Sequence, residues 1–181
     1  MGKLLSLFRI SFNRTRFIFC KVLHKKVVCK GLCTSRCGNE FSLARNGELH
    51  IGYHFAALKN CRFLVRNGKL VIGDYVGFNT NCVVACHEYI EIGDNVEFGP
   101  NVCIYDHDHD MKCNGGIKAG KFLTQPVKIG KNSWIGANVI ILRGAQIGEN
   151  CIIAAGSVVT GIVPDNSTFI QKRERTIISN Q

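Results

Sequence analysis

Residues 129–163 read IGKNSWIGANVIILRGAQIGENCIIAAGSVVTGIV, and every sixth position from Ile129 to Val159 is large and apolar. An α-helix would repeat about every 3.6 residues and a strand every two, so a period of six fits neither. Six-residue repeats are typical of a parallel β-helix, in which each step forms one short strand and one corner. The stretch therefore predicts two complete coils of three strands each.

The same spacing recurs upstream, where Ile51, Ile72 and Ile92 are each followed by glycine and open a new coil. The upstream and downstream stretches together give fifteen positions at this spacing, of which fourteen are large and apolar and Ala57 is the exception. The full set is Ile51, Ala57, Phe63, Ile72, Phe78, Val84, Ile92, Phe98, Ile104, Ile129, Ile135, Ile141, Ile147, Ile153 and Val159. We therefore expect an all-β solenoid over residues 31–166. Its repeat should end at Pro164, because proline cannot donate to a strand ladder.

The ten cysteines do not form a pattern typical of a disulfide framework. Cys61, Cys82 and Cys151 each stand four residues after a leading apolar position, in a slot that elsewhere holds valine, serine or alanine. Free cysteine behaves as a small apolar side chain, so we expect these three to point inward. The sequence predicts reduced thiols and a cytosol-like compartment.

Positive charge is concentrated at the beginning of the chain. The net charge is +10, and nine Lys and Arg residues precede the first acidic residue, Glu40. Residues 1–30 alternate apolar and basic positions at helical spacing, which predicts a basic amphipathic arm. The arm could cap the open end of the solenoid or contact a membrane surface through residues 1–24. A nucleic-acid role has no further motif to support it. Residues 167–181 form a polar, basic tail.

One long interruption breaks the repeat. Twenty-five residues separate Ile104 from Ile129 where six would suffice, so residues 105–126 should leave the solenoid as an extruded loop. The loop opens with Tyr-Asp-His-Asp-His-Asp at residues 105–110. Imidazole and carboxylate side chains suit proton transfer near neutral pH, and long loops on rigid scaffolds are often functional. We therefore expect the active site at this loop.

Three segments, residues 104–109, 126–137 and 154–160, resemble the hexapeptide-repeat acetyltransferases. The chain is most similar to the maltose and galactoside O-acetyltransferase branch, which includes bacterial polysaccharide O-acetyltransferases. This resemblance implies a left-handed parallel β-helix and a homotrimer with active sites between subunits. It also implies acetyl-CoA as the co-substrate, with no metal.

The resemblance assigns roles to individual residues. His109 matches the family's general base, and Asp108 or Asp110 is the candidate to orient it. The expected CoA contacts are Trp134, Ala137, Ala155, Thr160, Lys172 and Arg173, and the expected acceptor contacts are Asn79, His87, His107 and Asp108. The sequence departs from the family at His87, where an acidic residue is expected. It departs again near the C-terminus, where the family's Gly-Asn-Pro-Ala stretch is absent.

The sequence thus predicts an acetyl-CoA-dependent O-acetyltransferase that acts on a sugar or cell-surface glycan precursor, in the cytoplasm or at the inner face of the membrane. Three alternatives stay open at this stage. The acceptor could be a small amine or a xenobiotic. The protein could be a zinc enzyme like the γ-type carbonic anhydrases, using His87, His107 and His109. It could also be a trimeric scaffold without catalytic activity.

Overall fold

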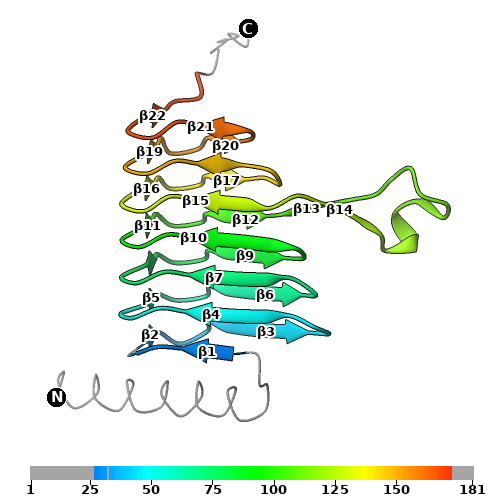
Figure 1. Ribbon diagram of the computed structural model, residues 1–181, viewed down its shortest axis with the longest axis horizontal. Coiled ribbons are helices and arrows are strands. Elements are labelled where there is room, and N and C mark those ends of the chain that lie inside the picture. The colour runs from blue at the N-terminus through cyan, green and yellow to red at the C-terminus, as the bar shows by residue number, and fades with distance from the viewer. Residues whose placement is uncertain (1–26, 32, 173–181) are drawn as a thin grey trace, which may run out of the picture.

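The computed structural model describes residues 27–31 and 33–172 of the chain. Three parallel sheets form the faces of a prism, and each coil adds one short strand to each face in turn (Figure 1). We call the three faces A, B and C. Along the chain, a strand of the A face is followed by one of the B face and one of the C face, and then by the A-face strand of the next coil. The predicted all-β solenoid of hexapeptide repeats is confirmed, and it is consistent with a left-handed β-helix.

The A face consists of β1 (Val27–Cys29), β4 (Glu48–Ile51), β7 (Lys69–Ile72), β10 (Tyr89–Ile92), β15 (Val127–Ile129), β18 (Gln146–Ile147) and β21 (Ile162–Val163). The B face consists of β2 (Thr34–Ser35), β5 (Ala56–Ala57), β8 (Gly77–Phe78), β11 (Glu97–Phe98), β16 (Trp134–Ile135), β19 (Ile152–Ile153) and β22 (Thr168–Phe169). The C face consists of β3 (Glu40–Ala44), β6 (Arg62–Arg66), β9 (Val83–Cys86), β12 (Cys103–Tyr105), β17 (Ile140–Ile141) and β20 (Val158–Val159).

The interior is an unbroken apolar column built by the six-residue period. Ile51, Ile72 and Ile92 occupy the same register on three successive A strands, and the column continues through Ile129 and Ile147. All fifteen positions predicted to point inward are buried, with at most 3% of their surface exposed. Cys61, Cys82 and Cys151 are buried as predicted, and each is a free thiol.

Asparagine side chains stabilise the corners between coils. Most corner residues with a left-handed backbone are asparagines, a residue type that tolerates positive φ better than other non-glycine residues. Their amides form ladders from coil to coil. One runs from Asn81 to Asn101 and Asn138 at 3.1 and 3.0 Å. These ladders hold the coils in register, so the positions of side chains at the corners are fixed.

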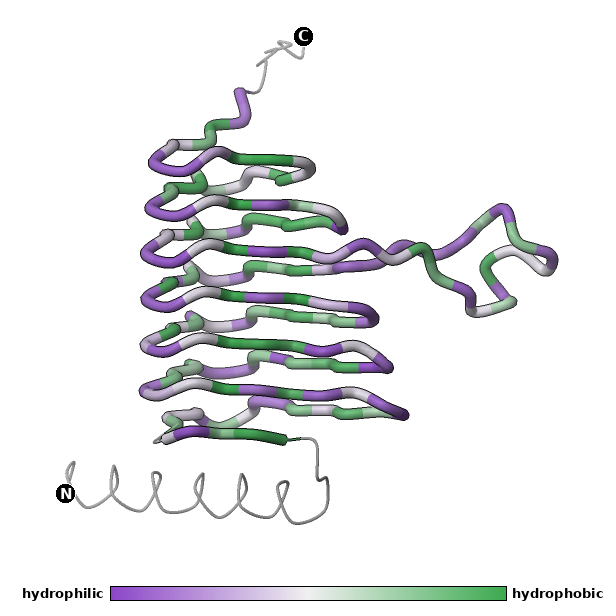
Figure 2. The backbone as a smooth tube through the Cα atoms, in the orientation of Figure 1, coloured by the Kyte–Doolittle hydropathy of each residue, from purple (hydrophilic) through white to green (hydrophobic). Residues whose placement is uncertain are grey.

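The predicted interruption lies between β12 and β15, but Tyr105 still belongs to β12 and Asp106 is buried, so the arm begins at His107. The arm is an antiparallel pair of β13 (His107–His109) and β14 (Phe122–Thr124), tipped by the 3₁₀ turn η1 (Gly116–Ala119). Figure 1 shows this arm projecting sideways from the stack of coils. In Figure 2 the arm alternates hydrophilic and hydrophobic segments along its length, whereas the coils carry their apolar positions at regular intervals.

The solenoid extends beyond the predicted range at both ends. Strand β1 falls within residues 1–30 and pairs with β4, so the described part of the first coil begins at Val27. Strand β22 pairs with β19 after Pro164, so the expectation that the repeat ends at this proline is wrong. Pro164 lies in a corner rather than in a strand, and the ladder does not need its missing N–H.

Several predictions fall on residues 1–26 and 173–181, which lie outside the described residues. The helical form of the arm, its contact with a membrane and the role of Arg173 are among them. Within the described ranges, no helix has the length and apolar character needed to cross a membrane.

Candidate functional site

The base of the arm brings two histidines face to face. His87 follows β9 at the corner between the C and A faces, and His107 occupies the equivalent place one coil further along, where the arm begins. Their imidazole rings stack with centroids 3.6 Å apart and planes 3° from parallel. Phe122 of β14 packs edge-on against both rings. The two acceptor-side histidines predicted from the sequence therefore form one cluster.

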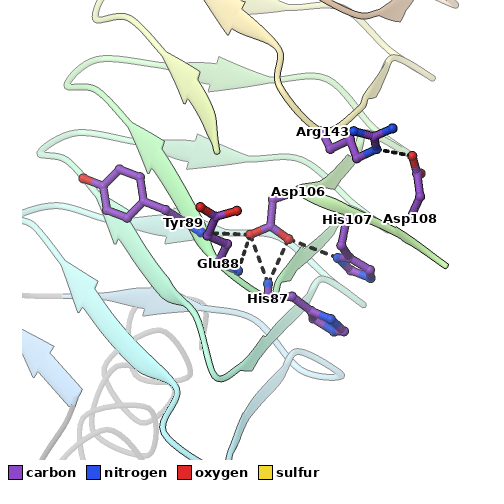
Figure 3. Close-up of polar contacts among 7 residues, drawn as sticks. All are labelled: His87, Glu88, Tyr89, Asp106, His107, Asp108 and Arg143. Carbon is purple, nitrogen blue, oxygen red and sulfur yellow. Dashed lines mark hydrogen bonds and ion pairs between the residues drawn. The ribbon is translucent and has the colours of Figure 1, made fainter. Parts of the chain in front are cut away.

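Asp106 is the buried anchor of this cluster (Figure 3). Its carboxylate accepts backbone N–H bonds from His87, Glu88 and Tyr89 at 2.7–3.0 Å, and it lies 3.0 Å from Nδ1 of His107. Burial alone would raise the pKa of Asp106, but these hydrogen bonds outweigh it and hold the pKa below its usual value. Asp106 is therefore ionised at neutral pH, and it fixes the tautomer and orientation of His107.

Burial lowers the pKa of His87 to about 4, and the neighbouring His107 and Arg66 add to the effect. His87 is consequently a neutral imidazole at neutral pH. It can offer one N–H and one unprotonated nitrogen to a ligand, but no charge.

His109 is exposed and lies on the same face of β13 as His107, two residues further along the arm. Its ring packs against Phe122 at 4.7 Å, and its partner in the antiparallel pair is also Phe122. Neither of the two aspartates expected to orient it contacts its ring. Asp108 forms an ion pair with Arg143 of the next coil, and Asp110 accepts backbone N–H bonds from Lys112 and Cys113. His109 therefore presents its imidazole outward, where a substrate can reach it.

The residues expected to contact CoA lie at two edges of the prism. Ala137 and Ala155 stand one above the other where the B face turns to the C face, and Gly156 N–H donates to the Ala137 carbonyl at 2.8 Å. Position 136 requires glycine, because a Cβ there would come within 2.7 Å of the Ala155 backbone nitrogen. Trp134 lies on the neighbouring B face and is 53% exposed. Thr160 instead follows β20, at the edge between the C and A faces.

The remaining predicted residues are not brought together with the histidines. Asn79 lies at the edge between the B and C faces, so one chain does not place it beside His107. Lys172 is exposed at the end of the described chain. In residues 27–31 and 33–172, no three His, Cys, Asp or Glu side chains are grouped to hold a metal ion. His87 and His107 stack in parallel, an arrangement in which their nitrogens do not converge on one point.

Sequence reasoning missed four residues of this corner: Asp106 as an anchor, Phe122, and the arginines Arg45 and Arg66. The two arginines line a cleft together with His87 and Phe122. A signal for them was present, because the tripeptide Arg-Asn-Gly occurs at residues 45–47 and again at 66–68. A repeated polar tripeptide near the corners of a β-helix indicates that successive corners place polar side chains on one edge, although the register pairs Arg66 with Ala44 and sets Arg45 one position further on.

Comparison with known proteins agrees with this architecture. Residues 126–161 match the family described as bacterial transferase hexapeptide (six repeats). The chain is 42% identical over 101 residues to a galactoside O-acetyltransferase of Lactococcus lactis, covering 56% of this chain and 47% of that protein. It is 27% identical over 141 residues to a putative lipopolysaccharide biosynthesis O-acetyl transferase of Escherichia coli, covering 70% of this chain and 69% of that protein. The chain spans about half the length of most curated relatives that it matches.

Among solved structures, the fold is similar to that of AntD, an N-acyltransferase from Bacillus cereus, in the crystal structure of a point mutant with a dTDP-linked amino sugar and coenzyme A. The TM-score is 0.70 at 21% identity, over 89% of this chain and 88% of that one. At this level of identity the comparison supports the fold. Residues 126–161 therefore carry the repeat described by that family model, and the two curated relatives named above are described as O-acetyltransferases, one of them putative.

Proposed function

We propose that this protein is an acetyl-CoA-dependent O-acetyltransferase that acylates a hydroxyl group of a sugar or glycan precursor. The observation that carries the proposal is the arm of β13 and β14. A regular hexapeptide solenoid extrudes one long segment, and that segment packs His107 and His109 against Phe122, a residue that lines a cleft. The similarity to a galactoside O-acetyltransferase and to a putative lipopolysaccharide O-acetyl transferase supports a sugar hydroxyl as acceptor.

In the proposed reaction His109 is the general base. Its unprotonated ring nitrogen takes the proton of the acceptor hydroxyl as the oxygen attacks the thioester carbonyl. The new C–O bond forms, the C–S bond breaks, and the imidazolium returns the proton to the departing CoA thiolate. A positioned base typically contributes about 10²–10⁴-fold to the rate. The ring of His109 is exposed, and the packing of the cluster leaves it accessible to an acceptor.

His107 is the second candidate for the base. The observation in its favour is the 3.0 Å contact between its Nδ1 and the ionised Asp106 carboxylate, which leaves Nε2 to accept a proton. This is the usual arrangement of a base with its orienting acid. Against it, the His107 side chain is only 14% exposed and one of its faces is covered by His87. We therefore assign His107 a positioning role.

Acetyl-CoA fits the column of small residues at the edge between the B and C faces. Ala137 is half-buried and Ala155 is exposed there, both with small side chains, and Trp134 on the adjoining B face is exposed. The pantetheine arm would lie along this edge, and Thr160, Lys172 and Arg173 remain candidates for further contacts.

A second copy of the chain would complete the site. The small-residue edge carries Ala137, Ala155 and Asn79, whereas the histidines lie at the edge between the C and A faces. These edges belong to different corners of one prism, so a neighbouring subunit is needed to bring acetyl-CoA and Asn79 to His109. The projecting arm is suited to reach across such an interface, and we propose the homotrimer expected of this family.

The proposed class of acceptor also implies where in the cell the protein acts. A cell-surface glycan precursor would be acylated in the cytoplasm or at the inner face of the membrane, where the basic residues 1–24 would attract anionic lipid. Flotation with anionic vesicles tests this part, since the chain should float and a variant lacking residues 1–24 should not.

The activity is tested by measuring the free thiol of CoA released from acetyl-CoA in the presence of a panel of sugars. Wild type should release thiol with at least one sugar, with the acetyl ester detected by mass spectrometry, and His109→Ala should not. Thiol release by His109→Ala at the wild-type rate would contradict the role of His109. Acetyl transfer to an amine in place of a hydroxyl would favour the N-acyl alternative.

A further inference from the structure

A small cleft opens beside the histidine cluster. It has a volume of about 220 Å³ and is lined by Arg45, Arg66, Asn67, His87, Phe122 and Thr124. Sites that enclose a whole small molecule usually measure about 300–1,000 Å³. The cleft is therefore suited to one group of a larger ligand. The arm forms one wall, and the corners of three successive coils form the other.

The register places these side chains in a column. Val65 pairs with Cys86 and Ala85 pairs with Tyr105, so Arg66, His87 and His107 follow one another at equivalent places in three coils. Arg45 belongs to the coil before Arg66, at the same edge. A ligand held by the two arginines would thus extend along the edge toward the histidines.

The arginines of the cleft have no acidic partner among the described residues. Arg62 pairs with Glu40 and Arg143 pairs with Asp108, but no ion pair is formed by Arg45 or Arg66 within residues 27–31 and 33–172. The Asp106 carboxylate is already engaged by three backbone N–H groups and His107. The carboxylate of Glu88 and the ring of His87 point apart in Figure 3. Among the described residues, the cleft therefore holds two arginines that no acidic side chain pairs with.

The backbone at Arg45 gives independent support. Arg45 has a φ of +57°, and nine of the twelve non-glycine residues with positive φ are asparagines. Arginine is a less favourable residue than asparagine in this conformation. Its presence at this corner indicates that the side chain, rather than the turn, determines the residue type.

We propose that this cleft, which we call the arginine cleft (Arg45, Arg66 and His87), binds the phosphoryl groups of the acceptor, and that the acceptor is a sugar linked to a phosphate or diphosphate. The proposal rests on the proposed function and specifies its substrate. Arginine binds phosphate through paired N–H donors, and two arginines match a group with more than one negative charge. The neutral His87 can add a hydrogen bond to the phosphate without adding a charge that would repel the arginines. The sugar would then lie toward His107 and His109.

Calorimetric titration of the full chain tests the arginine cleft directly. The probes are UDP-glucose, a nucleotide-linked sugar, and farnesyl diphosphate, which has the prenyl-linked diphosphate of a lipid carrier. Glucose is the neutral control. Wild type should bind at least one diphosphate probe at least tenfold more tightly than glucose. The probe that binds identifies whether the diphosphate belongs to a nucleotide-linked sugar or to a lipid carrier. The double variant Arg45→Gln/Arg66→Gln should lose that preference. Arg62→Gln, on the same strand as Arg66 but outside the cleft, should retain it.

Two results would overturn this inference. One is equal binding of the diphosphate probes by wild type and the double variant. The other is loss of acetyl-CoA affinity in the double variant with no loss for the probes, which would assign the arginines to the phosphates of CoA. Failure of wild type to bind acetyl-CoA would contradict the proposed function, whereas the probe titrations would still decide whether the cleft binds diphosphate.

Discussion

The imidazole rings of His87 and His107 are stacked in parallel at 3.6 Å, at the point where the arm leaves the solenoid. The register of the β-helix produces this contact, because the two residues occupy the same place in successive coils. Asp106 fixes one ring through Nδ1 of His107 and fixes the other through the backbone N–H of His87. One buried carboxylate thus sets the geometry of the whole corner.

We expect the stability of the protein to depend on pH through His87. Its pKa is lowered to about 4 in the folded protein, whereas an unfolded chain would show about 6.5. The unfolded state therefore binds more protons between these values, and the free energy of unfolding should fall as the pH falls from about 6.5 to 4. Urea titrations at several pH values measure this slope. His87→Phe should flatten it, and an unchanged slope in that variant would show that another group is responsible.

Asp106→Ala should be the most destabilising change at the site. It leaves three backbone N–H groups without their acceptor, and breaking a buried charged network typically costs about 3–5 kcal/mol. Asp106→Asn keeps one oxygen acceptor and should cost less. The exposed ion pair of Asp108 with Arg143 provides the control, since Asp108→Asn should change the free energy of unfolding by less than about 1 kcal/mol. Equal losses for Asp106→Ala and Asp108→Asn would show that Asp106 is not the anchor.

The two loop histidines should differ in their effect on the rate. With any accepted sugar, His109→Ala should lower kcat by at least about 100-fold, the lower range for loss of a general base. His107→Phe retains an aromatic ring on His87 and should lower kcat by about tenfold, as expected of a residue that positions others. The pH dependence of kcat should survive in His107→Phe. The reverse order of effects would make His107 the base.

Two adjacent isoleucines of β17 test the orientation of the solenoid strands. Ile141 is fully buried, whereas Ile140 is 37% exposed. Ile141→Ala should lower the free energy of unfolding by about 2–5 kcal/mol, because it leaves a cavity in the apolar column. Ile140→Ala should cost no more than about 1 kcal/mol. Similar losses from both variants would contradict the inward and outward assignment of this strand.

Most of the fold could be predicted because the six-residue period is a direct consequence of the coil geometry. One inward side chain is needed on each face, and Ile129, Ile135 and Ile141 satisfy that need in order. The ends were less predictable. Strand β22 continues past Pro164, because the proline falls in a corner where no N–H is used. Sequence spacing does not distinguish a proline in a corner from one that ends a sheet.

The site was predicted only in part. The length of the interruption located the arm, but pairing within it depends on register. That register places Asp106 inside the prism and turns Asp108 toward Arg143, although the two aspartates look alike in the sequence. The arginine cleft was missed because Arg45 and Arg66 are far apart along the chain and meet only when coils stack. Repeated tripeptides at corners are the signal that would have found them.

Calorimetric titration of acetyl-CoA into the full chain, with His109→Ala and Trp134→Ala in parallel, decides whether this β-helix is an acetyl-CoA-dependent enzyme. Wild type and His109→Ala should bind acetyl-CoA alike, because the proposed role of His109 is to deprotonate the acceptor. Trp134→Ala should bind it more weakly, because the exposed indole stands beside the proposed path of the pantetheine arm. Absence of binding by folded wild type at millimolar acetyl-CoA would contradict an acetyl-CoA-dependent function for this protein.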